Sequence, residues 1–327
     1  MKVAIYGAGA IGAHLGGMLA RTDVETSLIA RGPHLQAMQA NGLLCRFQDG
    51  SEFRVHPNAT DDPASLGPQD YVIVTLKAHQ SPGVVDLMQP LLGPETAVVT
   101  AMNGVPWWYF HGLEGALAGR SLESVDPGQT QWRGLGPERA IGMVVHPAAE
   151  IVEPGVMLHM EGDAYPLGEP SGEKTPRVSA LSAALEAAGL RAPIRTKIRD
   201  DIWMKLWGNL CLNPVSALTG STLAGMGRDD AVRELLFRLA AEGRAVGEAL
   251  GARFRVTAER RLAAAFDVGE HKTSMLQDLE RGRPMEIDAL VTAVTELGRA
   301  VGVATPLLDG VLALVKLKAH NAGLYPA

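Results

Sequence analysis

The feature that most restricts the fold is a glycine-rich turn at the start of the chain. It follows an apolar run at residues 3–6 and precedes an apolar segment with helical spacing at residues 10–20. In such a turn the first glycine permits a tight reversal, the second lets the backbone approach a pyrophosphate, and the third allows close packing of helix and strand. The start of the helix also favours an anion. The turn consists of Gly7, Ala8, Gly9, Ala10, Ile11 and Gly12.

The rest of the first half alternates between short apolar strands and helical or loop segments. Strand patterns lie at residues 26–30, 71–76 and 96–100, with further strands near 140–146 and 155–160. A hairpin is expected around Asp49-Gly50, a helix at residues 34–41 and another near 83–88, and a loop or an elaboration of the sheet edge at 113–137. Alternation of this kind is typical of a doubly wound α/β sheet. Together with the glycine turn it predicts a Rossmann-type dinucleotide-binding domain.

The pattern changes near residue 197, after which every periodic segment is helical. We predict an α/β domain at residues 1–195 followed by an all-α C-terminal domain at residues 196–327. The expected helices cover residues 198–218, 230–250, 257–281, 284–301 and 306–319.

Composition excludes several classes of protein. A formal net charge of −6 argues against nucleic acid as the main partner, because phosphate binding needs a clustered basic surface. No apolar stretch is long enough for a membrane span, and no Cys/His spacing indicates a metal site. The apolar N-terminus is superficially like a signal peptide, but its cleavage would remove the glycine turn. With only two cysteines, Cys45 and Cys211, we expect a reducing, cytoplasmic compartment.

The segment after the second strand indicates which dinucleotide is bound. An acidic residue there would bind the ribose 2′-hydroxyl of NAD, whereas this strand is followed by Arg31, a cation suited to a 2′-phosphate. We therefore expect NADP(H); the alternative is that Arg31 is a solvated surface residue. Lys77 and Asn103 follow two further strands, at the edge of the sheet where ligands bind in this architecture.

The helix expected at residues 198–218 carries the most informative polar side chains. Lys205, Asn209 and Asn213 are spaced four residues apart and so share one face of an otherwise apolar helix. Buried polar groups need hydrogen-bond partners, which a polar substrate would supply. A lysine whose pKa burial has lowered suits proton donation to a ketone. The alternative is that the asparagines bond to neighbouring loops and the lysine reaches water.

Two further polar residues lie near the break expected at Gly282 and Pro284. We expect Pro284 to start a helix, which places Glu286 in its first turn, where a carboxylate ordinarily complements the helix dipole. Ser274 precedes this segment, and no motif supports it as a nucleophile.

Four separated motifs together resemble the ketopantoate reductase family, the 2-dehydropantoate 2-reductases. They are GAGAIG, VTLKAHQ, the Lys-x3-Asn-x3-Asn-Pro helix, and TSMLQDLERGRPMEID, and they span nearly the whole chain. The resemblance implies NADPH-dependent reduction of 2-dehydropantoate to pantoate, on the route to pantothenate and coenzyme A. It implies a Rossmann domain joined to a helical domain, with the active site in the cleft between them.

The resemblance also assigns roles to individual residues. Lys205 would donate a proton to the ketone oxygen, and Glu286 would bind the substrate hydroxyl or the cofactor ribose. Asn103 would touch both ligands, and Lys77 would lie beside the dinucleotide with the glycine turn and Arg31. The remaining substrate-binding residues would be Asn209, Asn213 and Ser274.

Two departures from the family pattern concern the substrate. The aromatic run Trp107-Trp108-Tyr109-Phe110 replaces smaller residues, and His271 stands where the best-known members have asparagine. The sequence therefore leaves open another branched 2-oxo acid as substrate. It also leaves open a catalytically silent NADP(H) sensor and a homodimer, although a sensor would not need Lys205 together with Glu286.

Overall fold

In the computed structural model, which describes residues 1–325, the chain forms two compact units. The boundary predicted after residue 195 lies just before the division between Ile198 and Arg199. Two short segments that the sequence analysis assigns to the first domain, Asn103–Val105 and Leu122–Val125, group with the second unit. The first unit consists of Met1–Met102, Pro106–Ser121 and Asp126–Ile198.

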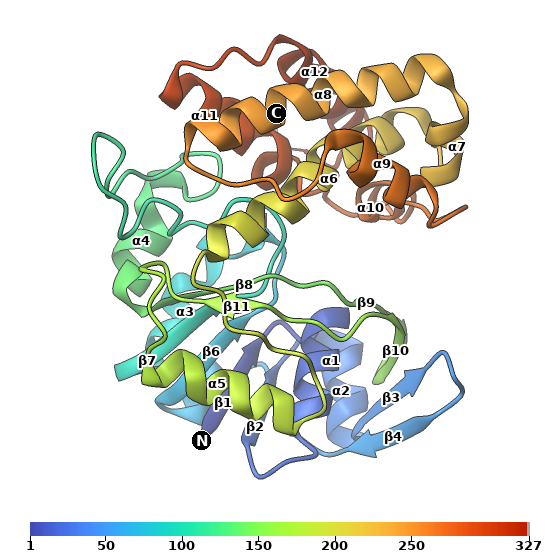
Figure 1. The fold of residues 1–327 in the computed structure, drawn as a ribbon. Coiled ribbons are helices and arrows are strands. Elements are labelled where there is room, and N and C mark those ends of the chain that lie inside the picture. Colours follow the sequence, from blue (N-terminus) through green and yellow to red (C-terminus); the bar gives the residue numbers. More distant parts are fainter. Residues whose placement is uncertain (326–327) are drawn as a thin grey trace. The chain divides into compact units, whose positions relative to one another are not determined.

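The core of the first unit is a seven-stranded sheet with the order β11-β8-β7-β6-β1-β2-β5 (Figure 1). Its strands pair in parallel except β11, which is antiparallel to β8. This confirms the predicted doubly wound α/β class, with β1 as a central strand. The strands are β1 (Lys2–Tyr6), β2 (Glu25–Ile29), β5 (Asn58–Thr60), β6 (Gln69–Val74), β7 (Leu92–Thr100), β8 (Ala140–Met143) and β11 (Leu167–Gly168).

A second sheet in this unit has the order β4-β3-β10-β9. Strands β3 (Leu43–Phe47) and β4 (Glu52–Val55) form the hairpin predicted around Asp49-Gly50. Strand β10 (Val156–Glu161) adds to β3 in parallel and pairs with β9 (Ala148–Glu153) in antiparallel. The sequence analysis did not predict β9, whose residues are at best partly buried and therefore lack a strong apolar pattern.

Helix α1 (Ala10–Leu19) contacts both sheets of the first unit and joins them. Its glycines make this possible: a Cβ on Gly16 would collide with Leu28 in β2, and one on Gly17 would lie 2.5 Å from the Cys45 sulfur in β3. The other helices are α2 (Gly32–Asn41), α3 (Val85–Met88), α4 (Thr130–Leu135) and α5 (Pro176–Ala187). Helix α4 lies within the segment predicted as a loop, and α5 was not predicted.

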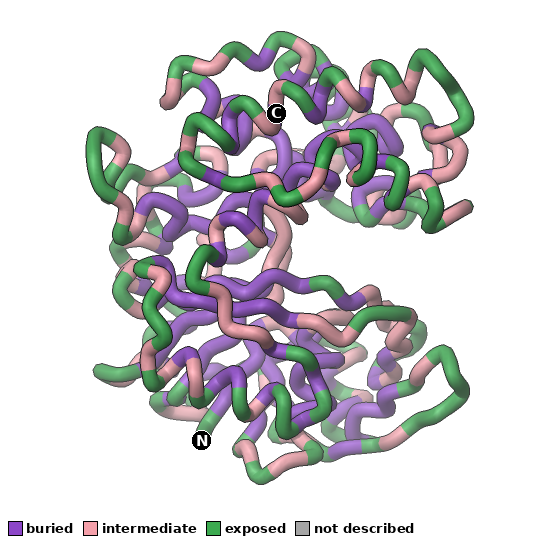
Figure 2. Tube along the Cα trace, viewed as in Figure 1, coloured by how far each residue is buried: buried purple, intermediate pink, exposed green. Residues whose placement is uncertain are grey.

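The second unit is helical, as predicted, and its long helix α6 (Ile198–Thr219) is deeply buried (Figures 1 and 2). Trp203 and Trp207 of α6 pack edge-to-face on Phe254, and the Trp207 indole donates to the Ala240 carbonyl at 2.8 Å. The remaining helices are α7 (Leu223–Arg228), α8 (Asp230–Ala249), α9 (Ala258–Phe266), α10 (Ser274–Glu280), α11 (Ala293–Val301) and α12 (Pro306–Asn321), with a π-helical turn at Asp288–Thr292 before α11.

Two helix predictions in this unit are wrong. Residues 257–281 form α9 and α10, because Gly269 adopts a positive φ of 91° and Thr273 starts a new helix by capping the Leu276 amide. Helical structure after Pro284 begins only at Ile287, so Glu286 precedes the helix, and its carbonyl accepts from Leu290. The short α7 was also not predicted.

A buried histidine lies where α1 meets the second sheet. His14 of α1 is 1% exposed, its Nδ1 lies 2.7 Å from the Tyr165 hydroxyl, and its ring stacks on His159 at 4.6 Å between centroids. Burial, reinforced by His159, lowers the pKa of His14 to about 3, with Asp163 opposing the shift. The folded protein therefore holds this imidazole neutral.

We expect stability to fall with acidification through His14. Its folded pKa lies below its unfolded value, so its contribution is complete above about pH 6.5 and is lost as pH falls. The loss is about 2 kcal/mol in the free energy of unfolding at pH 5. Urea denaturation at pH 5 and pH 7 measures it. In the variant His14→Gln the free energy of unfolding should depend less on pH than in the wild type. The control His320→Gln, at an exposed position, should keep the pH dependence of the wild type.

Candidate cofactor and substrate sites

The glycine turn connects β1 to α1 as the sequence predicts. Gly7 has a φ of 105°, and the amides of Gly7 and Ala8 donate to the Ile29 carbonyl at 3.1 and 2.9 Å. A Cβ on Gly12 would lie 2.6 Å from the Thr75 hydroxyl and closer still to the Gly7 carbonyl. A Cβ on Gly9 would meet nothing within 4 Å. The turn is thus closely packed at its third glycine and open at its second, where the motif expects a pyrophosphate.

The start of α1 has the electrostatic character of an anion site. Gly9 is its N-cap without a side-chain cap, and its first turn contains no acidic residue. The amides at this end have no intrahelical acceptor and carry the positive end of the helix dipole.

Arg31 and Lys77 lie at the same edge of the sheet as the glycine turn. β2, β1 and β6 are neighbouring parallel strands, and Arg31, Gly7 and Lys77 follow their carboxyl ends. Arg31 is exposed and is the N-cap of α2, and Lys77 precedes a short 3₁₀ turn. The structure therefore brings these three predicted cofactor residues to one edge.

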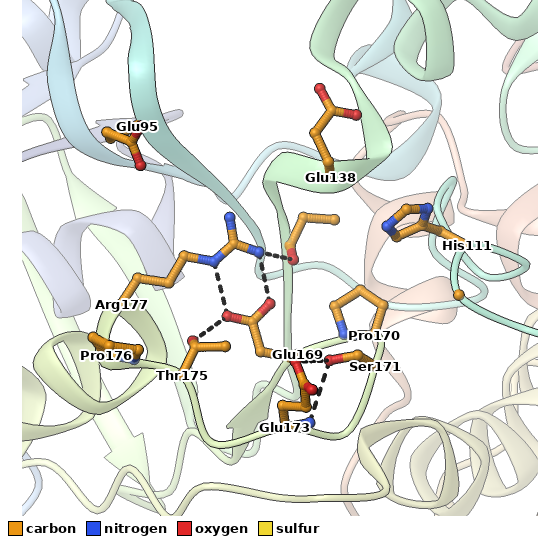
Figure 3. Close-up of a pocket in the computed structure, with 12 residues that line it drawn as sticks. Glu95, His111, Glu138, Glu169, Pro170, Ser171, Glu173, Thr175, Pro176 and Arg177 are labelled. Carbon is orange, nitrogen blue, oxygen red and sulfur yellow. Dashed lines mark hydrogen bonds and ion pairs between the residues drawn. The ribbon is translucent and has the colours of Figure 1, made fainter.

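A cavity of about 420 Å³ elsewhere in the first unit contains none of the predicted site residues. Figure 3 shows that it surrounds the ion pair of Glu169 and Arg177, with the Thr175 hydroxyl beside the carboxylate. Arg177 donates to both Glu169 oxygens, at 2.8 and 2.7 Å, and Thr175 donates at 2.6 Å. Because Glu169 is buried and its oxygens are already paired, this cluster holds β11 to α5 and offers little to a ligand.

In the second unit, α6 presents Lys205 in a poorly solvated environment. Burial lowers the pKa of the Lys205 ammonium to about 8, with the Glu286 carboxylate opposing the shift and the Arg261 guanidinium adding to it. Lys205 therefore interacts electrostatically with the Glu286 carboxylate and with the Arg261 guanidinium. An ammonium with a pKa near 8 releases its proton far more readily than an exposed lysine.

Two hydrogen bonds connect the other predicted substrate residues. The Asn103 amide donates to a Glu286 oxygen at 3.2 Å, although 183 positions separate them in the sequence. The Asn213 amide donates to the Ser274 hydroxyl at 3.5 Å, a long bond. Glu286 is 9% exposed, Asn213 4%, and Asn209 of the same α6 face is partly buried. The second unit thus brings Asn103 to Glu286 and Asn213 to Ser274.

The position of Asn103 depends on the next residue, Gly104. Gly104 has a φ of 90°, and a Cβ there would lie 2.7 Å from the Ala289 side chain. The Val105 amide donates to the Ala289 carbonyl at 3.0 Å. This close contact fixes the segment Asn103–Val105 beside the π-helical turn that follows Glu286.

The two departures from the family pattern lie in different settings. The four aromatic residues 107–110, which belong to the first unit, are each at most 3% exposed, and the Trp108 indole donates to the Thr100 hydroxyl at 2.8 Å. They are therefore buried core residues of the folded chain. His271 has an exposed side chain, and its carbonyl accepts from the Leu223 amide at 2.9 Å.

The sequence analysis missed Arg261, which lies near Lys205. It is on α9, and its guanidinium packs against Gly208 of α6. No spacing in the sequence relates it to Lys205, because the two helices meet only in the folded unit. The available signal was Gly208, a glycine among bulky residues of α6, which indicates that another side chain packs closely at this position.

The parallel sheet, the glycine turn at its edge and the all-helical second unit together define a class of dinucleotide-dependent oxidoreductases. Residues 3–172 match the family described as "Ketopantoate reductase PanE/ApbA", and residues 197–319 match "Ketopantoate reductase PanE/ApbA C terminal". The chain belongs to the ketopantoate reductase family, whose members are oxidoreductases acting on a carbonyl or the corresponding alcohol.

Individual relatives agree over the whole length. A 2-dehydropantoate 2-reductase of Mesorhizobium japonicum is 54% identical, covering 99% of this chain and 100% of its own. A solved structure from Ralstonia solanacearum MolK2, provisionally described as a ketopantoate reductase, is 42% identical with a TM-score of 0.94 and covers 99% of both chains. The 2-dehydropantoate 2-reductase of Geobacter metallireducens GS-15 is 27% identical, covering 97% of this chain and 99% of its own, with a TM-score of 0.84.

Within residues 1–325 there is no helix with both the length and the apolar character that crossing a membrane requires.

Two glycine variants should separate folding from cofactor binding. Gly9→Ala should keep wild-type stability, because its Cβ enters open space, but should weaken NADPH binding at least tenfold by blocking the pyrophosphate. Gly12→Ala should lower the melting temperature, because its Cβ collides with the Gly7 carbonyl. Thermal denaturation and NADPH fluorescence titration measure both. Wild-type NADPH affinity in Gly9→Ala would contradict the assignment of this turn.

Proposed function

We propose that this protein reduces 2-dehydropantoate to pantoate with NADPH, and that Lys205 donates the proton. The observation that carries the proposal is the lowered pKa of Lys205, close to the Glu286 carboxylate, on a helix face shared with Asn209 and Asn213. Family membership supports the reaction class, and the 54% identical relative supports the substrate.

The proposed chemistry divides one reduction between cofactor and protein. When bound, the dinucleotide supplies a hydride to the carbonyl carbon. Lys205 transfers a proton to the carbonyl oxygen, so that the product forms as an alcohol and no alkoxide accumulates. The negative charge of Glu286 stabilises the ammonium form of Lys205. Glu286 accepts a hydrogen bond from Asn103 and can accept another from a substrate hydroxyl or the cofactor ribose. A pKa near 8 keeps Lys205 mostly protonated at neutral pH, yet acidic enough to donate.

The amides and hydroxyl near Lys205 suit the polar end of the substrate. Asn213 and Ser274 form a long hydrogen bond that a ligand would compete with easily, and Asn209 lies between Asn213 and Lys205 on α6. Each amide offers both donor and acceptor atoms, as recognition of a hydroxyl requires. We propose that these three residues orient the substrate.

NADP(H) is proposed over NAD(H) because of Arg31 at the carboxyl end of β2. The residue is exposed at the N-terminus of α2, at the edge that carries the glycine turn, and an arginine fork pairs well with a phosphate. Lys77 at the same edge would add positive charge beside the dinucleotide.

We propose that this reaction serves pantothenate and coenzyme A synthesis in the cytoplasm. The two cysteines are both free and buried, as a reducing compartment permits.

An NADPH-oxidation assay with a panel of 2-oxo acids tests the function as a whole. 2-Dehydropantoate should give the highest kcat/KM of the panel. A higher value for another branched 2-oxo acid would replace the substrate but keep the mechanism. NADPH binding without oxidation by any 2-oxo acid would instead favour a regulatory sensor.

Removal of the proton donor should reduce turnover and leave cofactor binding intact. We expect Lys205→Ala to lower kcat by about 10²–10⁴ with nearly unchanged NADPH affinity. In the wild type, kcat/KM should fall as pH rises through about 8, because the ammonium is then lost. The control Lys197→Ala, at an exposed position, should behave as the wild type. A near-normal kcat in Lys205→Ala would remove this residue from its role.

Arg31 should set the cofactor preference. Arg31→Ala should weaken NADPH binding by about tenfold or more and NADH binding hardly at all, since only NADPH carries the 2′-phosphate. Dissociation constants from fluorescence titration with both cofactors measure this. Equal losses for NADPH and NADH would show that Arg31 does not read the phosphate.

A further inference from the structure

Arg261 occupies a space on α6 that a glycine leaves open. Its guanidinium lies so close to Gly208 that a Cβ there would be 2.8 Å from the central guanidinium carbon and closer to Nη2. The side chain is partly buried between α9 and α6, and burial lowers its pKa. The second unit thus holds a planar cation against the helix that carries Lys205.

This cation has no anionic partner in the described part of the chain. Its guanidinium donates no hydrogen bond and forms no ion pair there, and the group that opposes the lowering of its pKa is the Cys211 thiol. Burial raises the pKa of that thiol to about 12, so the thiol is neutral at pH 7. Several arginines of the second unit behave differently, since acids pair with Arg228, Arg233, Arg244, Arg255 and Arg299.

A desolvated cation without a partner is costly, and proteins usually provide one. Arg261 also adds to the effect that lowers the pKa of Lys205, so two cations lie close together, and the Glu286 carboxylate opposes the shift at Lys205. These two cations and one carboxylate together carry an excess of about one positive charge. A monoanionic ligand would neutralise it.

The position of Gly208 on α6 indicates where that anion binds. At about 100° per residue, Gly208 lies roughly 60° to one side of Lys205, whereas Asn209 and Asn213 lie roughly 40° and 80° to the other. Lys205 is thus flanked by a guanidinium on one side and by amides on the other. The proposed substrate 2-dehydropantoate has the same order of groups: a carboxylate, a ketone, and then a hydroxyl at its far end.

We infer that Arg261 binds the carboxylate of the 2-oxo acid substrate, with the ketone next to it at Lys205. The inference rests on the proposed function, because it assigns one more group of the same substrate. Arginine offers two parallel donors that match the two carboxylate oxygens. Neutralisation of Arg261 by the substrate also relieves its repulsion of Lys205, so that the substrate keeps its own proton donor charged.

A comparison of 2-dehydropantoate with its uncharged primary amide tests this assignment. Wild-type enzyme should prefer the acid strongly. Arg261→Gln should raise KM for the acid by about 100-fold, change kcat much less, and lose most of the preference over the amide. Gly208→Ala provides a second variant that leaves the arginine in place and displaces its guanidinium, and it should shift KM in the same direction.

The neighbouring exposed residue of α9 gives the matched control. Arg260→Gln removes the same charge from the same helix and should match the wild type in KM and in acid preference. NADPH affinity and the melting temperature should be close to wild type in Arg261→Gln, which separates carboxylate binding from a structural role. The alkaline limb of kcat/KM should also move to higher pH in that variant, because one cation that acts on Lys205 is gone.

Titration with pantoate in the presence of NADPH distinguishes the failure of this inference from that of the proposed function. Wild-type KM and acid preference in Arg261→Gln would overturn the role of Arg261 and leave the reductase assignment standing. Absence of turnover in the wild type would overturn the reductase assignment. Pantoate binding that is weakened in Arg261→Gln and not in Arg260→Gln would then still support Arg261 as an anion site, and equal binding would reject it.

Discussion

The desolvation of one ammonium group is the constraint on which the second unit depends. Lys205 lies on the deeply buried helix α6, where its pKa falls to about 8. A charge in such a place requires compensation, and the unit provides it through Glu286, which Asn103 fixes by a hydrogen bond. The tryptophans of α6 hold the helix in the core. Packing and chemistry thus share one helix, and a change in α6 affects both.

Glycine performs the corresponding task in the first unit. Gly12 permits the contact between the turn and Thr75, and Gly16 and Gly17 let α1 approach both sheets. Because α1 is held so closely, its N-terminus stays at the edge where β1, β2 and β6 end. The same recurrence of glycine appears in the second unit, where Gly208 makes room for Arg261 and Gly104 for Ala289.

The fold was predictable because its signals are local. Strand and helix patterns and the glycine turn each depend on a few adjacent residues, and the two-part architecture follows from them. Errors occurred where local signals were weak or misread. Residues 257–281 have helical spacing throughout, but a positive φ at Gly269 and the cap at Thr273 divide them. The irregular strand β9 has no alternating pattern to find.

The sequence by itself determined the α/β class, the helical second half, the glycine turn, and the shared face of Lys205, Asn209 and Asn213, because helical spacing fixes which neighbours on one helix point the same way. Only the tertiary structure decided that Asn103 bonds to Glu286, that residues 107–110 are core, and that Arg261 lies against α6 with no acid paired to it among residues 1–325. These relations join residues far apart in the chain. They depend on how helices pack and on which space a missing side chain leaves, which no local pattern records.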